Sequence, residues 1–162
     1  MKYGFALACS LASLAAPAMA TDTLVVEDGN AITLCRGARP AYETQLRSRP
    51  LAIVNESQDT SFVNCGWRAP TNSYGQEWVA VVLTNVDGPT RTVNCTGVFG
   101  TEDEGAEYVT KSVSVPQGGL AMIKWKYQQD NAGDRWQTNS AVQCLLPTGV
   151  GIARTPQAYR QE

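Results

Sequence analysis

The sequence predicts an all-β fold: a two-sheet antiparallel β-sandwich, of the jelly-roll or Ig-like kind, with two disulfides. Three observations predict it. Short runs rich in β-branched and aromatic residues recur from residue 23 onward. Turn-forming residues separate these runs, and no window has a sustained helical period. Four cysteines remain once the N-terminal segment is set aside, and in an exported chain this number is typical of two disulfides.

The expected strands begin and end where these runs meet turn-forming residues. They are Thr23–Glu27, Ala31–Cys35, Leu51–Asn55, Ser61–Cys65, Glu77–Asn85, Arg91–Phe99, Tyr108–Val115, Leu120–Tyr127, Ala141–Leu146 and Gly151–Arg154. The clearest turns are Asp28-Gly29-Asn30, Asp87-Gly88-Pro89 and Pro116-Gln117-Gly118-Gly119. One helical turn is expected within Ala41–Arg47, and no internal repeat or linker divides the chain.

Side chains alternate across a strand, which assigns the faces of two expected strands. In residues 120–127, the expected core face carries Ile123, Trp125 and Tyr127, and the expected solvent face carries Met122, Lys124 and Lys126. The run 78–83, Trp-Val-Ala-Val-Val-Leu, is apolar on both faces and is therefore expected to be a central strand.

The first twenty residues have the layout of a cleavable signal peptide. Lys2 supplies a positive charge, an apolar segment runs from Gly4 to Ala16, and a small-x-small sequence ends at Ala20. The apolar segment is shorter than the roughly 20 residues that span a bilayer. We therefore expect cleavage after Ala20 and a periplasmic or secreted mature chain. Residues 21–162 would form a single β-sandwich domain, with no transmembrane segment after signal removal.

Four cysteines are expected to form the disulfides, and they allow three pairings. They are Cys35, Cys65, Cys95 and Cys144. We prefer Cys35–Cys65, because these residues end neighbouring expected strands, and Cys95–Cys144, because both lie on apolar strand faces. A structural zinc site uses close pairs such as Cys-x-x-Cys, which these spacings do not provide.

Composition excludes several classes of function. The chain contains no histidine, so Ser-His-Asp and Cys-His catalysis are excluded. Without Lys2, the chain has 12 basic and 15 acidic residues, a formal charge of −3. A mildly acidic net charge argues against nucleic-acid binding, which usually needs a basic face, so no nucleic-acid partner is expected.

Aromatic residues in expected loop contexts are the strongest candidates for binding. They are Trp67, Tyr74 and Trp136. Aromatic side chains on sandwich loops can form a platform for sugar rings or for a protein partner. The structural alternative is that Trp67 covers a disulfide and that Trp136 caps the edge of the core.

Arginines crowd the segment that follows the first disulfide cysteine. They are Arg36, Arg39, Arg47 and Arg49. Guanidinium groups bind carboxylates and sulfates, so an acidic glycan or protein could dock at such a rim. The structural alternative is a charged loop or edge strand that resists aggregation.

Two segments are candidates for Ca²⁺, which prefers oxygen ligands. The first is Glu102-Asp103-Glu104, with Glu107 nearby, and it lacks the spacing of a known calcium loop. The second is Asp130-Asn131-Ala132-Gly133-Asp134, whose composition equally suits a plain turn. Calcium is therefore assigned to neither segment, and no cofactor is expected.

Two features of the sequence resemble a known group of proteins. They are the run from Val142 to Ile152 and the pairing of Val93-Asn94-Cys95 with residues 113–119. Together they resemble small exported bacterial β-sandwich proteins of uncharacterised function, over roughly residues 78–152. The resemblance implies the fold and export. It supplies no functional residue.

These observations favour an exported, non-catalytic bacterial envelope or secreted domain that acts by binding or as structure, with an unknown protein or glycan as partner. One alternative is a carbohydrate-binding sandwich that uses the loop aromatics. Another is a histidine-free hydrolase, because paired carboxylates can hydrolyse glycosides. No two acidic residues in the sequence are marked as facing each other.

Overall fold

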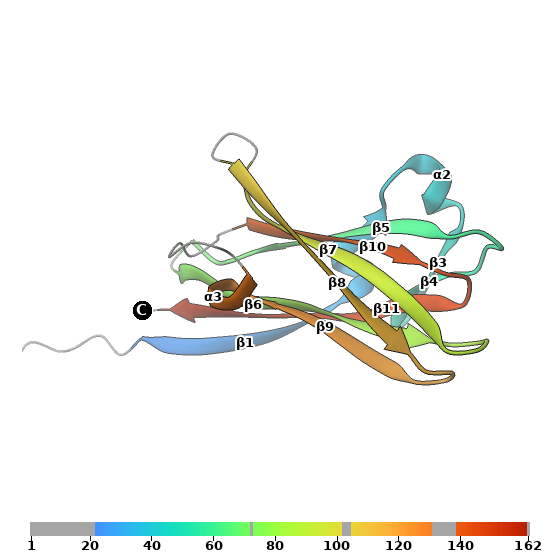
Figure 1. The fold of residues 1–162 in the computed structure, drawn as a ribbon. Helices are drawn as coiled ribbons and strands as arrows, with labels where there is room; N and C mark the ends of the chain where they lie inside the picture. Colours follow the sequence, from blue (N-terminus) through green and yellow to red (C-terminus); the bar gives the residue numbers. More distant parts are fainter. Residues whose placement is uncertain (1–21, 72, 102–104, 131–138, 162) are drawn as a thin grey trace, which may run out of the picture.

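The computed structural model describes residues 22–71, 73–101, 105–130 and 139–161, which form two antiparallel sheets packed face to face (Figure 1). The expected two-sheet sandwich is confirmed. The expected signal peptide, residues 1–20, lies outside the described residues. No helix in the described part of the chain is long and apolar enough to cross a membrane.

The first sheet has the strand order β3-β4-β11-β6-β9, and β1 also pairs with β11. Its strands are β1 (Thr23–Asn30), β3 (Leu46–Arg49), β4 (Ala52–Asn55), β6 (Ser73–Asn85), β9 (Leu120–Lys126) and β11 (Val150–Gln161). One side of β11 is shared between two strands: β4 pairs with Gly151 and Ile152, and β1 pairs with 154–161. The other side of β11 pairs with β6.

The second sheet has the order β2-β5-β10-β7-β8. Its strands are β2 (Cys35–Gly37), β5 (Ser61–Arg68), β7 (Arg91–Thr101), β8 (Gly105–Val115) and β10 (Asn139–Leu146). Three single-turn helices join strands: α1 (Ala31–Leu34), α2 (Pro40–Glu43) and α3 (Tyr127–Asp130).

The strand expected at Ala31–Cys35 is wrong, because residues 31–34 form α1 and only Cys35 begins a strand. Asn30 starts this helix: its side chain accepts a hydrogen bond from Ile32 N (3.1 Å), as an N-cap residue does. The expected turn Asp28-Gly29-Asn30 is instead the end of β1, paired with Thr155 and its neighbours in β11. Pairing between distant strands overrides the local turn preference.

The core lies between the inner faces of the two sheets. Val79, Val81 and Leu83 of β6 lie beside Trp125 of the neighbouring strand β9. Together they pack against the buried residues of the second sheet in one hydrophobic cluster. Trp125 is fully buried, which confirms the expected core face of that strand. The inner faces therefore alternate with outer residues, as the sequence pattern indicates.

Both disulfides join residues that lie directly opposite each other on neighbouring strands of the second sheet. Cys35 of β2 is bonded to Cys65 of β5, and Cys95 of β7 to Cys144 of β10. All four cysteines are buried, and the pairing is the one preferred from the sequence.

Candidate functional site

Trp67, the first expected binding residue, is part of the core. It is 4% exposed, and its Nε1 donates a hydrogen bond to Thr155 O of the opposite sheet (2.9 Å). Its ring therefore offers no open face to a ligand, in line with the structural alternative. Tyr74 belongs to β6, but its side chain is outside the described part of the structure, and Trp136 lies outside it entirely.

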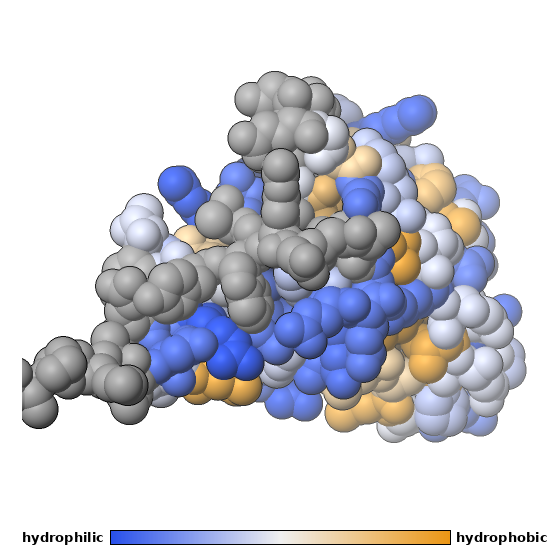
Figure 2. Space-filling model, turned by 60° about the vertical axis from the view of Figure 1, so that its left-hand side comes forward, coloured by the Kyte–Doolittle hydropathy of each residue, from blue (hydrophilic) through white to orange (hydrophobic). Residues whose placement is uncertain are grey.

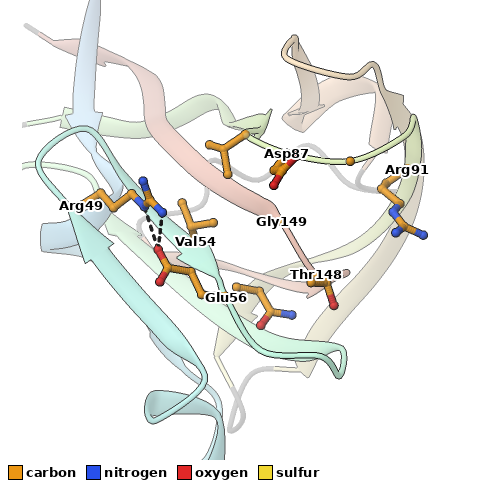
Figure 3. Close-up of a pocket in the computed structure, with 10 residues that line it drawn as sticks. Arg49, Val54, Glu56, Asp87, Arg91, Thr148 and Gly149 are labelled. Atoms are coloured by element: carbon orange, nitrogen blue, oxygen red, sulfur yellow. Dashed lines mark hydrogen bonds and ion pairs between the residues drawn. The ribbon is translucent and has the colours of Figure 1, made fainter.

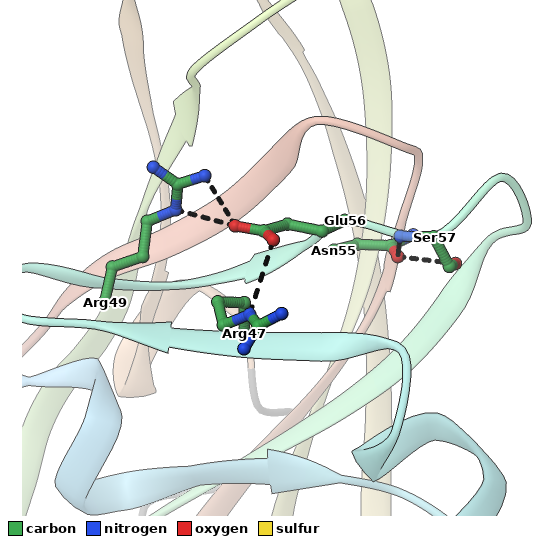
Figure 4. Close-up of polar contacts among 5 residues, drawn as sticks. All are labelled: Arg47, Arg49, Asn55, Glu56 and Ser57. Carbon is green, nitrogen blue, oxygen red and sulfur yellow. Dashed lines mark hydrogen bonds and ion pairs between the residues drawn. The ribbon is translucent and has the colours of Figure 1, made fainter.

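Two of the four candidate arginines bind a carboxylate of the chain itself. Arg47 and Arg49 of β3 both reach Glu56, with Nε to carboxylate distances of 3.4 and 2.8 Å (Figure 4). The hydrogen bond from Arg49 holds the pKa of Glu56 below its usual value, and Arg47 adds to this effect. Arg36 lies in β2 of the other sheet and Arg39 precedes α2, and neither forms an ion pair with Glu56.

A polar cavity of about 330 Å³ lies beside this ion pair (Figure 3). Arg49, Glu56, Asp87 and Arg91 line it together with Thr148 and small or apolar residues. The cavity holds charges of both signs, and Arg49 and Glu56 already neutralise each other. No aromatic ring is among its described lining residues, so it lacks a stacking surface for a sugar.

The expected acidic segments lie mostly outside the described residues, which exclude 102–104 and 131–138. Asp130, at the edge of the second segment, is used inside the fold. Its carboxylate binds Lys111 Nζ (2.7 Å) and accepts a hydrogen bond from Lys126 N (2.8 Å). Among the described residues, no group of three or more histidine, cysteine or acidic side chains could hold a metal ion.

The outer face of the first sheet carries a tryptophan that sequence reasoning did not select. Val79 and Val81 of β6 are buried, so the alternating residue Trp78 points outward, where it is partly exposed. Trp78 lies between Lys126 of β9 and Ala158 of β11, its partners in the sheet. An aromatic ring therefore lies on the outer face of the first sheet.

A β-bulge accompanies this position. Trp78 pairs with β11, and the next pair along joins Gln76 to Tyr159, so Glu77 has no partner in β11. An extra residue of this kind changes which face its neighbours occupy. Gln76 faces the interior and accepts a hydrogen bond from Ser140 Oγ of the opposite sheet (2.6 Å). Glu77 remains at the surface beside Trp78.

Trp78 lines an open cavity of about 280 Å³. Three strands and α3 supply its described lining, which consists of Leu24, Glu77, Trp78, Lys124, Lys126, Gln128 and Gln129. Figure 2, turned toward the end of the sandwich that is on the left in Figure 1, shows hydrophilic surface beside smaller apolar patches. The described lining thus places one aromatic ring among amide and charged groups.

The electrostatics of the cavity are dominated by two ammonium groups. Lys124 Nζ lies 3.7 Å from the centroid of the Trp78 ring, in a cation–π contact. Burial lowers the pKa of Lys124, and the charge of Lys126 lowers it further. Glu77 is ion-paired to Arg160 (Nε to Oε2 3.2 Å), so it does not neutralise either lysine.

Trp78 also differs from the two buried tryptophans in its indole N–H. Trp67 Nε1 donates to Thr155 O, and Trp125 Nε1 donates to Val109 O (2.9 Å each). Trp78 Nε1 takes part in no hydrogen bond with the described residues. Among the described residues, Trp78 is therefore the tryptophan whose N–H has no hydrogen-bond acceptor.

Part of this site could be predicted and part could not. Alternation along 120–127 correctly places Lys124 and Lys126 on the solvent face. The run 78–83 is apolar on both faces, so alternation alone does not say that Trp78 is outward. The register that sets Trp78 opposite Lys126 depends on strand pairing across more than 40 residues of sequence, which no local pattern encodes.

No family model matches the chain, and no curated protein matches it. Several solved structures are weakly similar to it. The carbohydrate-binding module TmCBM27, described for specific mannan recognition, has a TM-score of 0.48 at 10% identity, over 88% of this chain and 100% of that one. CBM28, a module specific for non-crystalline cellulose, has a TM-score of 0.41 at 10% identity, over 79% of this chain and 87% of its own. An exo-β-1,3-galactanase from Phanerochaete chrysosporium has a TM-score of 0.44 at 13% identity, and this chain covers 30% of its length.

Proposed function

We propose that the chain is an exported, non-catalytic domain that binds carbohydrate at the Trp78 cavity. One observation carries the proposal. Of the three tryptophans in the described part of the chain, Trp78 has a partly exposed ring, an unused N–H, and a cavity rimmed by polar side chains. The amphipathic character of tryptophan suits a ligand that has both apolar and polar faces.

A pyranose ring has those two kinds of surface. Its axial C–H groups form an apolar patch that packs on an aromatic ring, and its hydroxyls form a polar rim. The amides of Gln128 and Gln129 can donate to and accept from such hydroxyls. The cavity volume, about 280 Å³, is close to the lower end of roughly 300–1,000 Å³ for small-molecule sites. A short saccharide segment therefore fits better than a large ligand.

The number and the pKa of the carboxylates favour binding over hydrolysis. Glycoside hydrolysis uses two carboxyl groups that flank the scissile bond. Glu77 is the single carboxylate among the described residues that line the Trp78 cavity. Glu56, in the polar cavity, has a pKa lowered by Arg49, whereas a general acid needs a raised pKa.

The test is a glycan array followed by calorimetry with the mature protein and its Trp78→Ala variant. We expect the affinity of the variant for the retained glycan to fall at least about tenfold, which corresponds to about 1.4 kcal/mol. Its melting temperature should change little, because the Trp78 ring lies on the outer face of the sheet.

Trp67→Phe is the matched control. It removes the hydrogen bond to Thr155 in the core and should lower stability by about 1–3 kcal/mol while glycan affinity is kept. Unchanged glycan affinity in Trp78→Ala, or no glycan retained by the wild-type protein, would contradict the proposal.

A further inference from the structure

Two ammonium groups lie side by side at the Trp78 cavity. Lys124 and Lys126 are separated by one residue on β9, and their side chains point to the same face of the sheet. Their Cα atoms lie about 6.6 Å apart along the strand. Neither ammonium group forms an ion pair with any described residue. One anionic group of a ligand could receive hydrogen bonds from both.

The nearby carboxylates already have cationic partners. Glu77 is bound by Arg160, and Asp130 is bound by Lys111 at 2.7 Å. The described residues that line the cavity therefore carry a net positive charge, although the whole sequence has a formal charge of −2. Positive charge concentrated at one cavity of an acidic chain favours an anionic ligand there.

Repulsion between the two lysines supports the same conclusion. Burial lowers the pKa of Lys124, and the charge of Lys126 is the second cause. An anion placed between the two ammonium groups would replace this repulsion with attraction. Ligand binding should then raise the pKa of Lys124.

Lys124 covers the Trp78 ring in the free protein, at 3.7 Å from the ring centroid. A cation–π contact at a partly exposed site is weaker than a charge-assisted hydrogen bond to a carboxylate or sulfate. The long, flexible lysine side chain can therefore turn from the ring to an anionic ligand. That movement uncovers the ring for the sugar, so charge recognition and stacking occur together.

We infer that the carbohydrate bound at Trp78 is anionic, with a carboxylate or sulfate held between Lys124 and Lys126. This inference rests on the proposed function and names the class of its ligand. Neutral sugars would gain the stacking contact but would leave the two ammonium groups unpaired, so they would bind more weakly.

The experiment compares each acidic glycan with its own neutral counterpart by calorimetry. Oligomers of galacturonate, glucuronate and mannuronate are paired with their methyl esters, and sulfated galactan oligomers with the desulfated parent. Each pair keeps the ring and linkage, and the neutral member lacks the negative charge. The uronate and sulfate arms distinguish the two sources of negative charge.

We expect at least one acidic form to bind roughly tenfold or more tightly than its neutral counterpart. This preference should be largely lost at about 1 M salt, where the Debye length is about 3 Å. Lys126→Met should remove most of the preference. Lys124→Ala should weaken binding of the acidic form but keep or improve that of the neutral form, because truncation of the side chain uncovers the Trp78 ring.

Arg91→Met is the matched control, because it removes a positive charge from the polar cavity and should leave the preference unchanged. Equal binding of acidic and neutral forms, with loss of both in Trp78→Ala, would overturn the anionic ligand and leave carbohydrate binding intact. Failure of every pair to bind would overturn the anionic ligand, and an array on which the wild-type protein retains no glycan would overturn both proposals.

Discussion

At the scale of single residues, Glu56 connects β3 to the segment that follows β4. It accepts hydrogen bonds from Arg47 and Arg49, and the bond from Arg49 is the main reason why its pKa is lowered. A carboxyl with a lower pKa in the folded state stabilises the fold in its charged form. That contribution is fully present well above the unfolded value of about 4.3, and it is lost as pH falls through the lower folded pKa.

The predicted result is a difference in acid sensitivity between the wild-type protein and Glu56→Gln. The free energy of unfolding of the wild-type protein should fall more steeply between about pH 5 and pH 3 than that of the variant. Urea denaturation at a series of pH values measures both curves. Parallel curves over this range would show that the ion pairs, which are exposed, contribute no measurable stability.

Trp67 and Trp78 show how far residue-level reasoning reaches. Trp67 follows Cys65 by two positions, so the two side chains share a strand face. A disulfide between Cys65 and Cys35 places this strand face in the core. If the expected strand Ser61–Cys65 is extended to Arg68, as in the structure, Trp67 also lies in the core. The neighbouring Gly66 instead suggested a loop. For Trp78 no such signal exists, because both faces of its strand are apolar.

At the scale of elements, β7 and the opposite strand β9 pack closely at Gly97. A Cβ atom added at Gly97 would lie 2.8 Å from Nε1 and 2.9 Å from Cδ1 of Trp125. The absence of a side chain thus makes room for the indole, which is fixed by its hydrogen bond to Val109 O. This contact brings the two sheets close together near the edge that β8 and β9 form.

Gly97→Ala should therefore lower the free energy of unfolding by about 1–3 kcal/mol, as overpacking does. Gly66→Ala is the matched control, because it also lies in a strand but has no atom within 4 Å of the added Cβ. It should be neutral or should stabilise by up to about 1 kcal/mol, through lower entropy of the unfolded chain. Guanidinium denaturation measures both, and equal effects of the two substitutions would contradict the packing explanation.

Most strands could be predicted from alternation and turn residues, but their ends could not. β11 was expected to end at Arg154 and continues to Gln161, past Pro156. Proline disfavours a central strand because it has no N–H to donate. Here Pro156 pairs with Asp28 of β1, and the recorded pairing with β6 resumes at Gln157. The extension depends on β1 as a partner, so only the tertiary structure reveals it.

At the scale of the whole molecule, the disulfides and the Trp78 cavity lie in different sheets. The second sheet contains both disulfides, and the first sheet carries the Trp78 cavity on its outer face. The covalent bonds lie on the other side of the core from the proposed ligand. Stability and binding should therefore respond to different substitutions.

The two disulfides close segments of similar size but connect different parts of the sheet. Their sequence separations are 30 and 49 residues. The chain-entropy model gives about 3.7 kcal/mol for the shorter loop and about 4.1 kcal/mol for the longer one. Loop length alone predicts nearly equal losses. Position predicts a difference, because Cys35 lies in the edge strand β2 and Cys95 in the interior strand β7.

We predict that the Cys95→Ser/Cys144→Ser variant loses stability throughout the sandwich, because β7 and β10 are central to the second sheet. Cys35→Ser/Cys65→Ser should lose a similar total but also open locally, since β2 is short and pairs only with β5 among the described strands. Hydrogen exchange detects this difference: amides of β2 and α1 should exchange faster than those of β5 and β10 in the second variant alone.

Both variants, while folded, should keep their affinity at the Trp78 cavity. Loss of affinity in either one would show that the second sheet holds the site in shape, and the separation of roles between the sheets would be wrong.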